Sequence, residues 1–268
     1  MSTMLVALLF LLSLSSTLSL SLQNIKLYDI PVSNHGARIR MIINSKKLNI
    51  QVLSPMTELG GLKSEEYLAL NPQGKMPLLT LPSGLSIPES DTISRYLLSS
   101  TSTINPTFLP STIHGELLSN QIIRLHDIYI SPIQGCMYRA LGSGFGRFGD
   151  NRQAAYDDLI KQLSCISDTI KMFYSKHKDL EAGRFLVGDE ISLADATLFP
   201  TLCFTEYMLP KFFDHDEYNH FLQKYFDLMR VTETGFIIKE EIYEALDAWH
   251  LSGRWDTIVE EGVGPKKE

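Results

Sequence analysis

The sequence predicts a two-domain protein in which a small α/β sheet domain precedes an all-α domain. Strand-like and helix-like patterns alternate over residues 25–98, whereas strand signals are absent from residue 113 to about residue 255. A Ser/Thr/Pro-rich stretch separates the two patterns and is typical of a linker. We therefore expect a sheet domain at residues 23–100, a linker at 101–112, a helical domain at 113–256 and a tail at 257–268.

The sheet domain should follow the order β-α-β-α-β-β-α. Its first helix carries Ile39, Met41 and Ile42 at helical spacing, and Pro82-Ser83-Gly84 predicts a tight turn between the last two strands. A small sheet with helices between its strands satisfies this order. The expected elements are strands at residues 25–30, 49–53, 76–81 and 85–87, and helices at residues 36–46, 64–70 and 90–98.

The helical domain should begin with a long helix that includes ELLSNQIIRLHDIYISPIQGCMY and kinks near Pro132, because proline cannot donate to the preceding turn. A second helix is expected over residues 152–174. Ser192 lies three residues before Asp195, which is the spacing of a capping box, so a third helix should start there.

Composition excludes several functional classes. The chain has 268 residues, 44% of them hydrophobic and 21% charged, which is enough for a sizeable core. The net charge of −7, with no run of five like charges, predicts no nucleic acid partner. The three cysteines (Cys136, Cys165 and Cys203) form no CxxC motif and no His/Cys pair at zinc spacing. We expect reduced, buried thiols and no metal.

Residues 1–22 predict a targeting leader. The first 25 residues carry no charge, and the apolar run MLVALLFLL passes into SLSSTLSLSL, which is too short an apolar stretch for a typical membrane helix. We expect delivery to the secretory pathway or an organelle such as the plastid; membrane anchoring and a cytoplasmic location are the alternatives. The odd cysteine count, the lack of an Asn-x-Ser/Thr sequon and the lack of arginine in the leader leave the compartment open.

Two segments suggest a peptide ligand. A proline at the start of a strand beside a sheet edge can follow a cis bond, and Met76 would then offer its backbone N–H and C=O to an extended peptide. Glu89-Ser90 begins a helix, where free amides bind a carboxylate and the glutamate side chain pairs with an ammonium group. A ligand with an α-amino acid head and a peptide backbone fits both segments.

Three segments together resemble the cytosolic-type glutathione S-transferases: LYDIPVSNHGARIR, NPQGKMPLL followed by IPESDTISRYL, and FLVGDEISLADATLFP. The resemblance covers nearly all of residues 25–255. It implies a thioredoxin-like first domain that binds glutathione, and an all-helical second domain that supplies most of the pocket for a hydrophobic electrophile. It also implies a homodimer.

The resemblance assigns roles to seven residues. Ser33 lies five residues before Arg38, as in serine-type members, and would donate a hydrogen bond that stabilises the glutathione thiolate. Met76-Pro77 would be the cis-proline step that pairs with the cysteinyl unit. The γ-glutamyl head would be held by Glu89 and Ser90, and the glycyl carboxylate by Lys63 and Lys75.

Simpler interpretations stand beside these roles. Ser33 is also suited to be the N-cap of the helix that follows it, Glu89-Ser90 could cap their own helix, and Lys63 and Lys75 could be ordinary surface lysines. Tyr28 is a rival to Ser33 because some family members use a tyrosine on the first strand, but its position inside LYDI predicts a packed side chain.

The expected activity is conjugation of glutathione to an electrophilic small molecule. Glutathione-dependent peroxide reduction is an alternative. Isomerisation is another, although the turn Ser33-Asn34-His35 departs from the Ser-Ser-Cys of maleylacetoacetate isomerases. Thiol transferases carry a cysteine where Ser33 stands, so that reaction is disfavoured. The alternative that is not an enzyme is a catalytically silent docking module.

Overall fold

The computed structural model describes residues 24–140, 142–180, 182–215, 217–256, 258, 261 and 263. It divides into two compact units, Met1–Asn105 and Pro106–Glu268, and the boundary falls within the predicted linker. The leader predicted at residues 1–22 lies outside the described residues, as does most of the tail predicted at residues 257–268. In the described part of the chain, no helix has the length and apolar character needed to cross a membrane.

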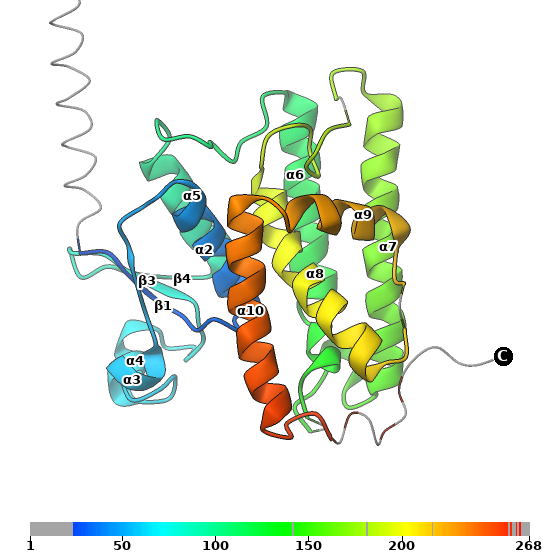
Figure 1. Ribbon diagram of the computed structural model, residues 1–268. Coiled ribbons are helices and arrows are strands. Elements are labelled where there is room, and N and C mark those ends of the chain that lie inside the picture. The colour runs from blue at the N-terminus through cyan, green and yellow to red at the C-terminus, as the bar shows by residue number, and fades with distance from the viewer. Residues whose placement is uncertain are drawn as a thin grey trace, which may run out of the picture. The chain divides into compact units, whose positions relative to one another are not determined.

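The first unit confirms the predicted order of strands and helices (Figure 1). One short helix was not predicted: α3, which Ser54 caps and which has Pro55 in its first turn. The elements are β1 (Lys26–Tyr28), α2 (Asn34–Ser45), β2 (Gln51–Leu53), α3 (Pro55–Glu58), α4 (Glu65–Leu70), β3 (Leu78–Thr80), β4 (Ser86–Pro88) and α5 (Ser90–Ser100).

The four strands form one mixed sheet in the order β2-β1-β3-β4. β1 and β2 run parallel, which requires a crossover connection, and α2 provides it. β3 runs antiparallel to both β1 and β4. Helices α2 and α5 pack against each other. Most fully buried side chains of this unit come from the sheet and these helices, and they include Leu27, Ile39, Leu79, Ile93 and Leu97.

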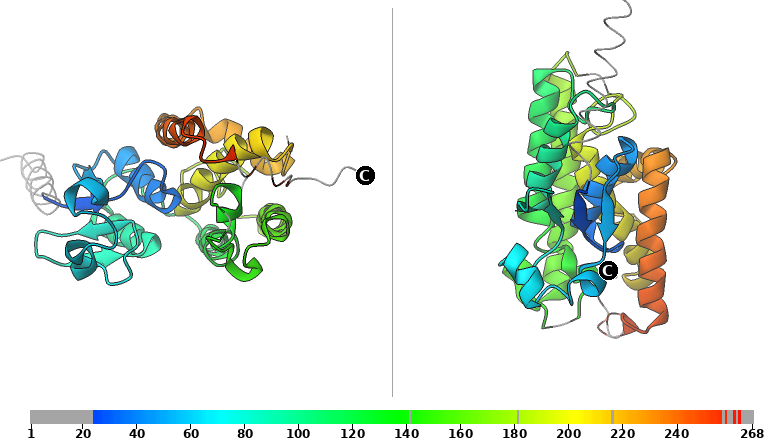
Figure 2. Two further views of the ribbon diagram at one scale, coloured as in Figure 1. Left: turned by 90° about the horizontal axis from the view of Figure 1, so that it is seen from below. Right: turned by 90° about the vertical axis from the view of Figure 1, so that its left-hand side faces the viewer.

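The second unit is all-helical, as predicted (Figure 2). Almost every residue of α8 is buried, which is typical of a helix that is apolar all round, and α8 contacts α6, α9 and α10. Helices α6 and α7 lie side by side. The α-helices of this unit are α6 (Ile113–Leu125), α7 (Arg152–Lys176), α8 (Leu193–Phe212), α9 (His220–Met229) and α10 (Glu233–Leu251).

The predicted kink near Pro132 was wrong, because the α-helix ends before this residue. α6 stops at Leu125, and a single π-helical turn, η1 (His126–Ile130), follows. The amide of Ser131 donates to the carbonyl of His126, five residues earlier, at 2.8 Å. Proline at position 132 has no amide hydrogen, and its ring would clash with the carbonyl four residues before it, so the chain leaves the α-helical path.

The predicted capping box at the start of α8 is confirmed. The Asp195 carboxylate accepts hydrogen bonds from the amide and the hydroxyl of Ser192, both at 2.7 Å. It also accepts from the amide of Leu186 at 2.9 Å. This fully buried carboxylate therefore joins the start of α8 to the loop that precedes it.

All three cysteines are free thiols, but the prediction that all three are buried was wrong for one of them. Cys136 and Cys203 are buried, and burial raises the pKa of the Cys136 thiol to about 12. Cys165 is exposed because its position on the long helix α7 faces solvent.

Candidate functional site

The candidate site in the first unit lies beside a row of residues that pair across three neighbouring strands. Tyr28, the last residue of β1, pairs with Leu78, the first residue of β3, and Leu78 pairs with Pro88, the last residue of β4. The segments just beyond this row therefore emerge at the same edge of the sheet. Those segments are the turn that contains Ser33, the Met76-Pro77 step and the Glu89-Ser90 pair.

Ser33 is the N-cap of α2. Its hydroxyl oxygen accepts a hydrogen bond from the amide of Gly36 at 3.0 Å, and its backbone is extended, as an N-cap requires. This confirms the capping interpretation. The hydroxyl is part-buried, and its oxygen acts as the acceptor in the cap, so a ligand that takes its hydrogen would compete with the Asp29 carboxylate.

An ion pair supports the turn that carries Ser33. The Arg40 guanidinium pairs with the fully buried Asp29 and also donates to the carbonyls of Ile30, at 3.1 Å, and Pro31, at 2.6 Å. Burial raises the pKa of Asp29 to about 6, and Arg40 and the Ser33 hydroxyl oppose this shift. A Cβ atom at Gly36 would lie 1.8 to 2.0 Å from the Asp29 carboxylate, so only glycine permits this approach.

The Met76-Pro77 peptide bond is cis, as the resemblance implied. Met76 lies just before β3, outside the paired residues of the sheet, and none of the described turn and loop hydrogen bonds involves its backbone. The neighbouring carbonyl of Lys75 accepts from the Tyr67 hydroxyl and from the Asn71 side chain, both at 2.7 Å. The two hydrogen bonds to Lys75 therefore fix the chain just before the cis bond. The Met76 backbone is available to pair with a ligand.

Tyr67 and Asn71 are the site residues that sequence reasoning missed. Tyr67 is fully buried and packs with Tyr28 and Leu78, and burial raises its pKa to about 12. This contact also confirms that Tyr28 is a packed side chain. Asn71 directly follows the helix predicted at residues 64–70, and an asparagine side chain at such a position commonly bonds to nearby backbone. That signal could have identified Asn71.

Glu89 has an unusual backbone conformation. Its φ of 68° and ψ of 116° lie in a region that L-residues rarely occupy, and such strain is concentrated at binding sites and active sites. Glu89 stands at the N-cap position of α5, but its side chain makes no capping hydrogen bond. The exposed carboxylate is thus available to a ligand, and Ser90 follows as the first residue of the helix.

The two lysines lie at the loop that precedes the cis step. The Lys63 ammonium donates to the carbonyl of Gln73 at 3.3 Å and lies close to Gly74. Lys75 is exposed. Lys75 thus directly precedes Met76 and the Lys63 ammonium lies at residues 73–74 of the same loop, where both cations can attract an anionic group.

The comparisons with known proteins agree with this geometry. Residues 27–103 match the family described as "Glutathione S-transferase, N-terminal domain". A tau class glutathione S-transferase from mango, Mangifera indica, superposes with a TM-score of 0.66 over 86% of this chain and 99% of its own, at 22% identity. The chain has the glutathione transferase fold. Residues 27–103 of its first unit match that N-terminal domain, and its second unit is the helical domain of the fold.

Two further proteins show how far the similarity extends. Glutathione S-transferase 3 from Zea mays is 29% identical over 185 residues, which cover 66% of this chain and 78% of the maize protein. The structure of a maleylacetoacetate isomerase from Methylobacterium extorquens AM1 with bound malonate and glutathione has a TM-score of 0.61 over 81% of this chain and 97% of its own, at 19% identity. Proteins named as a transferase and as an isomerase thus share this fold.

Proposed function

We propose that this protein is a serine-type glutathione transferase, which binds glutathione at the sheet edge of the first unit and joins it through its sulfur to a hydrophobic electrophile. The paired row at the ends of β1, β3 and β4 carries this proposal, because it gathers three segments that suit three parts of glutathione. The relatives named glutathione S-transferase support the same activity.

Each segment suits one part of the tripeptide. The Met76 backbone can pair with the cysteinyl unit in the manner of a short strand. The Glu89 carboxylate can pair with the α-ammonium of the γ-glutamyl head, and the first amides of α5, with Ser90, can bind its α-carboxylate. The glycyl carboxylate would extend toward Lys63 and Lys75.

The chemistry requires a thiolate, because a thiol is a poor nucleophile. Ser33 would donate its hydroxyl hydrogen to the glutathione sulfur, close to the positive end of the α2 dipole. Both effects stabilise the ionised sulfur over the thiol. The thiolate then forms a bond to the electrophilic carbon, and the leaving group departs with the bonding electrons.

The proposal is tested by titrating the full-length protein with glutathione in a calorimeter and then measuring glutathione consumption with an aryl halide. We expect saturable binding and the release of one halide for each glutathione consumed. Binding without turnover of any electrophile would favour the docking module. No binding would refute the glutathione assignment.

Isomerisation is the second candidate, and the isomerase structure with bound glutathione favours it. The two reactions differ in whether glutathione is consumed, because an isomerase regenerates the glutathione thiolate after each turnover. Turnover of maleylacetoacetate with no net loss of glutathione would therefore identify an isomerase. Loss of one glutathione for each product formed would identify a transferase.

Glu89→Gln should weaken glutathione binding about tenfold, since an ion pair with the γ-glutamyl ammonium would become a neutral hydrogen bond. Cysteinylglycine, which lacks the γ-glutamyl head, should bind both proteins equally. Calorimetric titration with both ligands checks this prediction. The control is Glu66→Gln, which removes an exposed carboxylate from α4 and should change neither affinity. An equal loss for both ligands would contradict the assigned role of Glu89.

A further inference from the structure

Helices α6 and α7 bring together two histidines and an aspartate that are far apart in the sequence. His114 lies in the first turn of α6, His177 is the C-cap of α7, and Asp179 follows two residues later. The two helices are packed neighbours, so the start of one lies beside the end of the other (Figure 2). The three side chains are remote in the chain from every residue assigned to glutathione.

The side chains converge closely. The Nδ1 atom of His114 lies 2.9 Å from both carboxylate oxygens of Asp179. The ring of His177 stacks on that of His114, with centroids 4.0 Å apart and an interplanar angle of 23°. One ligand atom from each of the three residues lies within 4.8 Å of the other two. In the described part of the chain, this is the one such group of three.

We propose that His114, His177 and Asp179 form a binding site for a first-row transition dication, and we commit to Zn²⁺ as its occupant. Two imidazole nitrogens and one carboxylate oxygen are a donor set that Zn²⁺ accepts readily. Bonds of about 2.0 to 2.2 Å in a tetrahedron place ligand atoms about 3.4 Å apart. The His114–Asp179 pair, at 2.9 Å, is slightly closer than this spacing, and the widest pair, within 4.8 Å, needs to close by at most about 1.4 Å.

The site is accessible and partly prearranged. The side chains of His114 and Asp179 are 37% and 40% exposed, so an ion can reach them from solvent. Phe173 contacts the His177 ring with centroids 5.5 Å apart and limits its movement. The ion would replace the hydrogen between Nδ1 and the carboxylate and would leave at least one coordination position for water.

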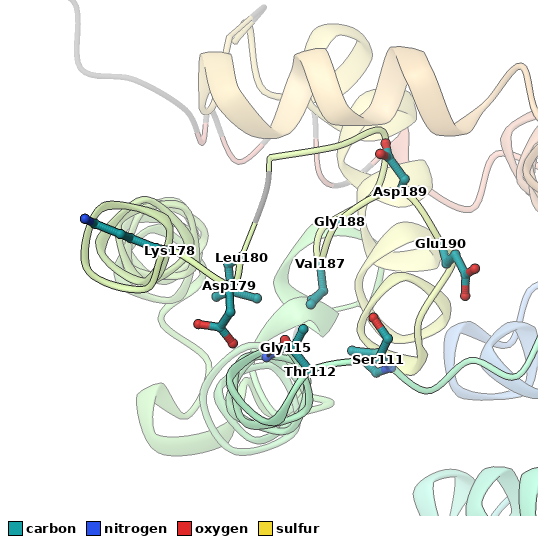
Figure 3. A pocket seen from close by; sticks show the side chains of 11 residues that line it. Ser111, Thr112, Gly115, Lys178, Asp179, Leu180, Val187, Gly188, Asp189 and Glu190 are labelled. Atoms are coloured by element: carbon teal, nitrogen blue, oxygen red, sulfur yellow. Dashed lines mark hydrogen bonds between the residues drawn. The ribbon is translucent and has the colours of Figure 1, made fainter.

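Asp179 also lines a hollow of about 360 Å³. Two more acids, Asp189 and Glu190, also line it, as does Lys178, whose side chain extends away from Asp179 (Figure 3). Acidic groups around a hollow raise the local concentration of cations. The hollow therefore provides a route by which a dication can reach the cluster.

The experiment uses untagged full-length protein, stripped of metal with a chelator that is then removed. Zn²⁺ is titrated in competition with a fluorescent zinc chelator. We expect one Zn²⁺ per chain, with at least tenfold weaker binding in His177→Ala and in Asp179→Asn. The matched control is His220→Ala, which removes a histidine whose side chain is 88% exposed and should leave the affinity unchanged.

Co²⁺ provides a second readout on the wild-type protein. We expect visible d–d bands that disappear when Zn²⁺ is added and that are absent from His114→Ala. Binding that is the same in the cluster variants and the wild type would overturn the proposal, as would a loss of equal size in His220→Ala or no binding at all. Thermal unfolding of each variant without metal identifies any variant that fails to fold. If one fails, the Co²⁺ spectrum of the wild-type protein, with its displacement by Zn²⁺, decides whether the dication binds.

Discussion

Ser33→Ala should return the thiol of bound glutathione to its ordinary pKa and lower kcat/KM about 25-fold near pH 7. A thiol of pKa about 8.5 is only about 3% ionised at pH 7, whereas a depression of two units raises this to about 75%. Such a depression corresponds to about 2.7 kcal/mol of preferential thiolate stabilisation. The thiolate absorbance of bound glutathione, followed against pH in wild type and variant, measures the effect directly.

The same variant should approach wild-type activity as the pH rises above about 9, because the thiol then ionises without help. This convergence separates thiolate stabilisation from simple damage to the fold. Ser33→Ala also removes the cap of α2, which costs about 1 kcal/mol of stability. Thr232→Ala is the matched control, because Thr232 caps α10 through the amide of Gly235 with the same 3.0 Å contact. Identical thiol pKa values in wild type and Ser33→Ala would remove Ser33 from the mechanism.

Asp195→Ala should lower the free energy of unfolding of the helical unit by about 4 kcal/mol. The side chain is fully buried and accepts from the amides of Ser192 and Leu186 and from the Ser192 hydroxyl. Alanine would leave these donors without their acceptor, and each buried unpaired donor costs about 1 to 3 kcal/mol. Burial raises the pKa of Asp195, and the same hydrogen bonds oppose that shift.

Urea unfolding followed by tryptophan fluorescence measures this loss, because both tryptophans of the chain, Trp249 and Trp255, belong to the helical unit. Asp189→Ala is the matched control: this exposed aspartate accepts one amide hydrogen bond, from Arg184, and its loss should cost less than about 1 kcal/mol. Equal midpoints for wild type and Asp195→Ala would show that the capping box contributes little.

Local patterns were sufficient for most of the secondary structure. Apolar spacing identified α2 and α7 within a few residues, and the serine and aspartate of the capping box identified the start of α8. The end of α6 was missed because the exchange of α-helical for π-helical hydrogen bonds depends on the surrounding packing as well as on Pro132. The exposure of Cys165 was missed for a related reason, since a helix pattern alone does not place each face of α7.

The same distinction between local patterns and tertiary packing applies to the residues of the candidate site. Ser33, Met76-Pro77 and Glu89-Ser90 are recognisable in the sequence because each belongs to a local motif at a turn or a helix start. Tyr67 and Asn71 act through contacts with the carbonyl of Lys75, which no spacing rule reveals. The positive φ of Glu89, at the point where β4 leads into α5, is likewise visible only in the structure.

The sequence by itself determined the sheet-then-helix organisation, most elements of the first unit, the caps at Ser33 and Ser192 and the candidate ligand-binding segments, because these depend on neighbours within a few positions. Only the tertiary structure decided which residues that are far apart in the sequence lie close together in space. The register of β1, β3 and β4 brings the segments proposed to bind glutathione to one edge. The packing of α6 against α7 places His114 beside His177 and Asp179, although the sequence had predicted no metal. Such long-range contacts depend on the packing of whole helices and strands, which no local sequence pattern encodes.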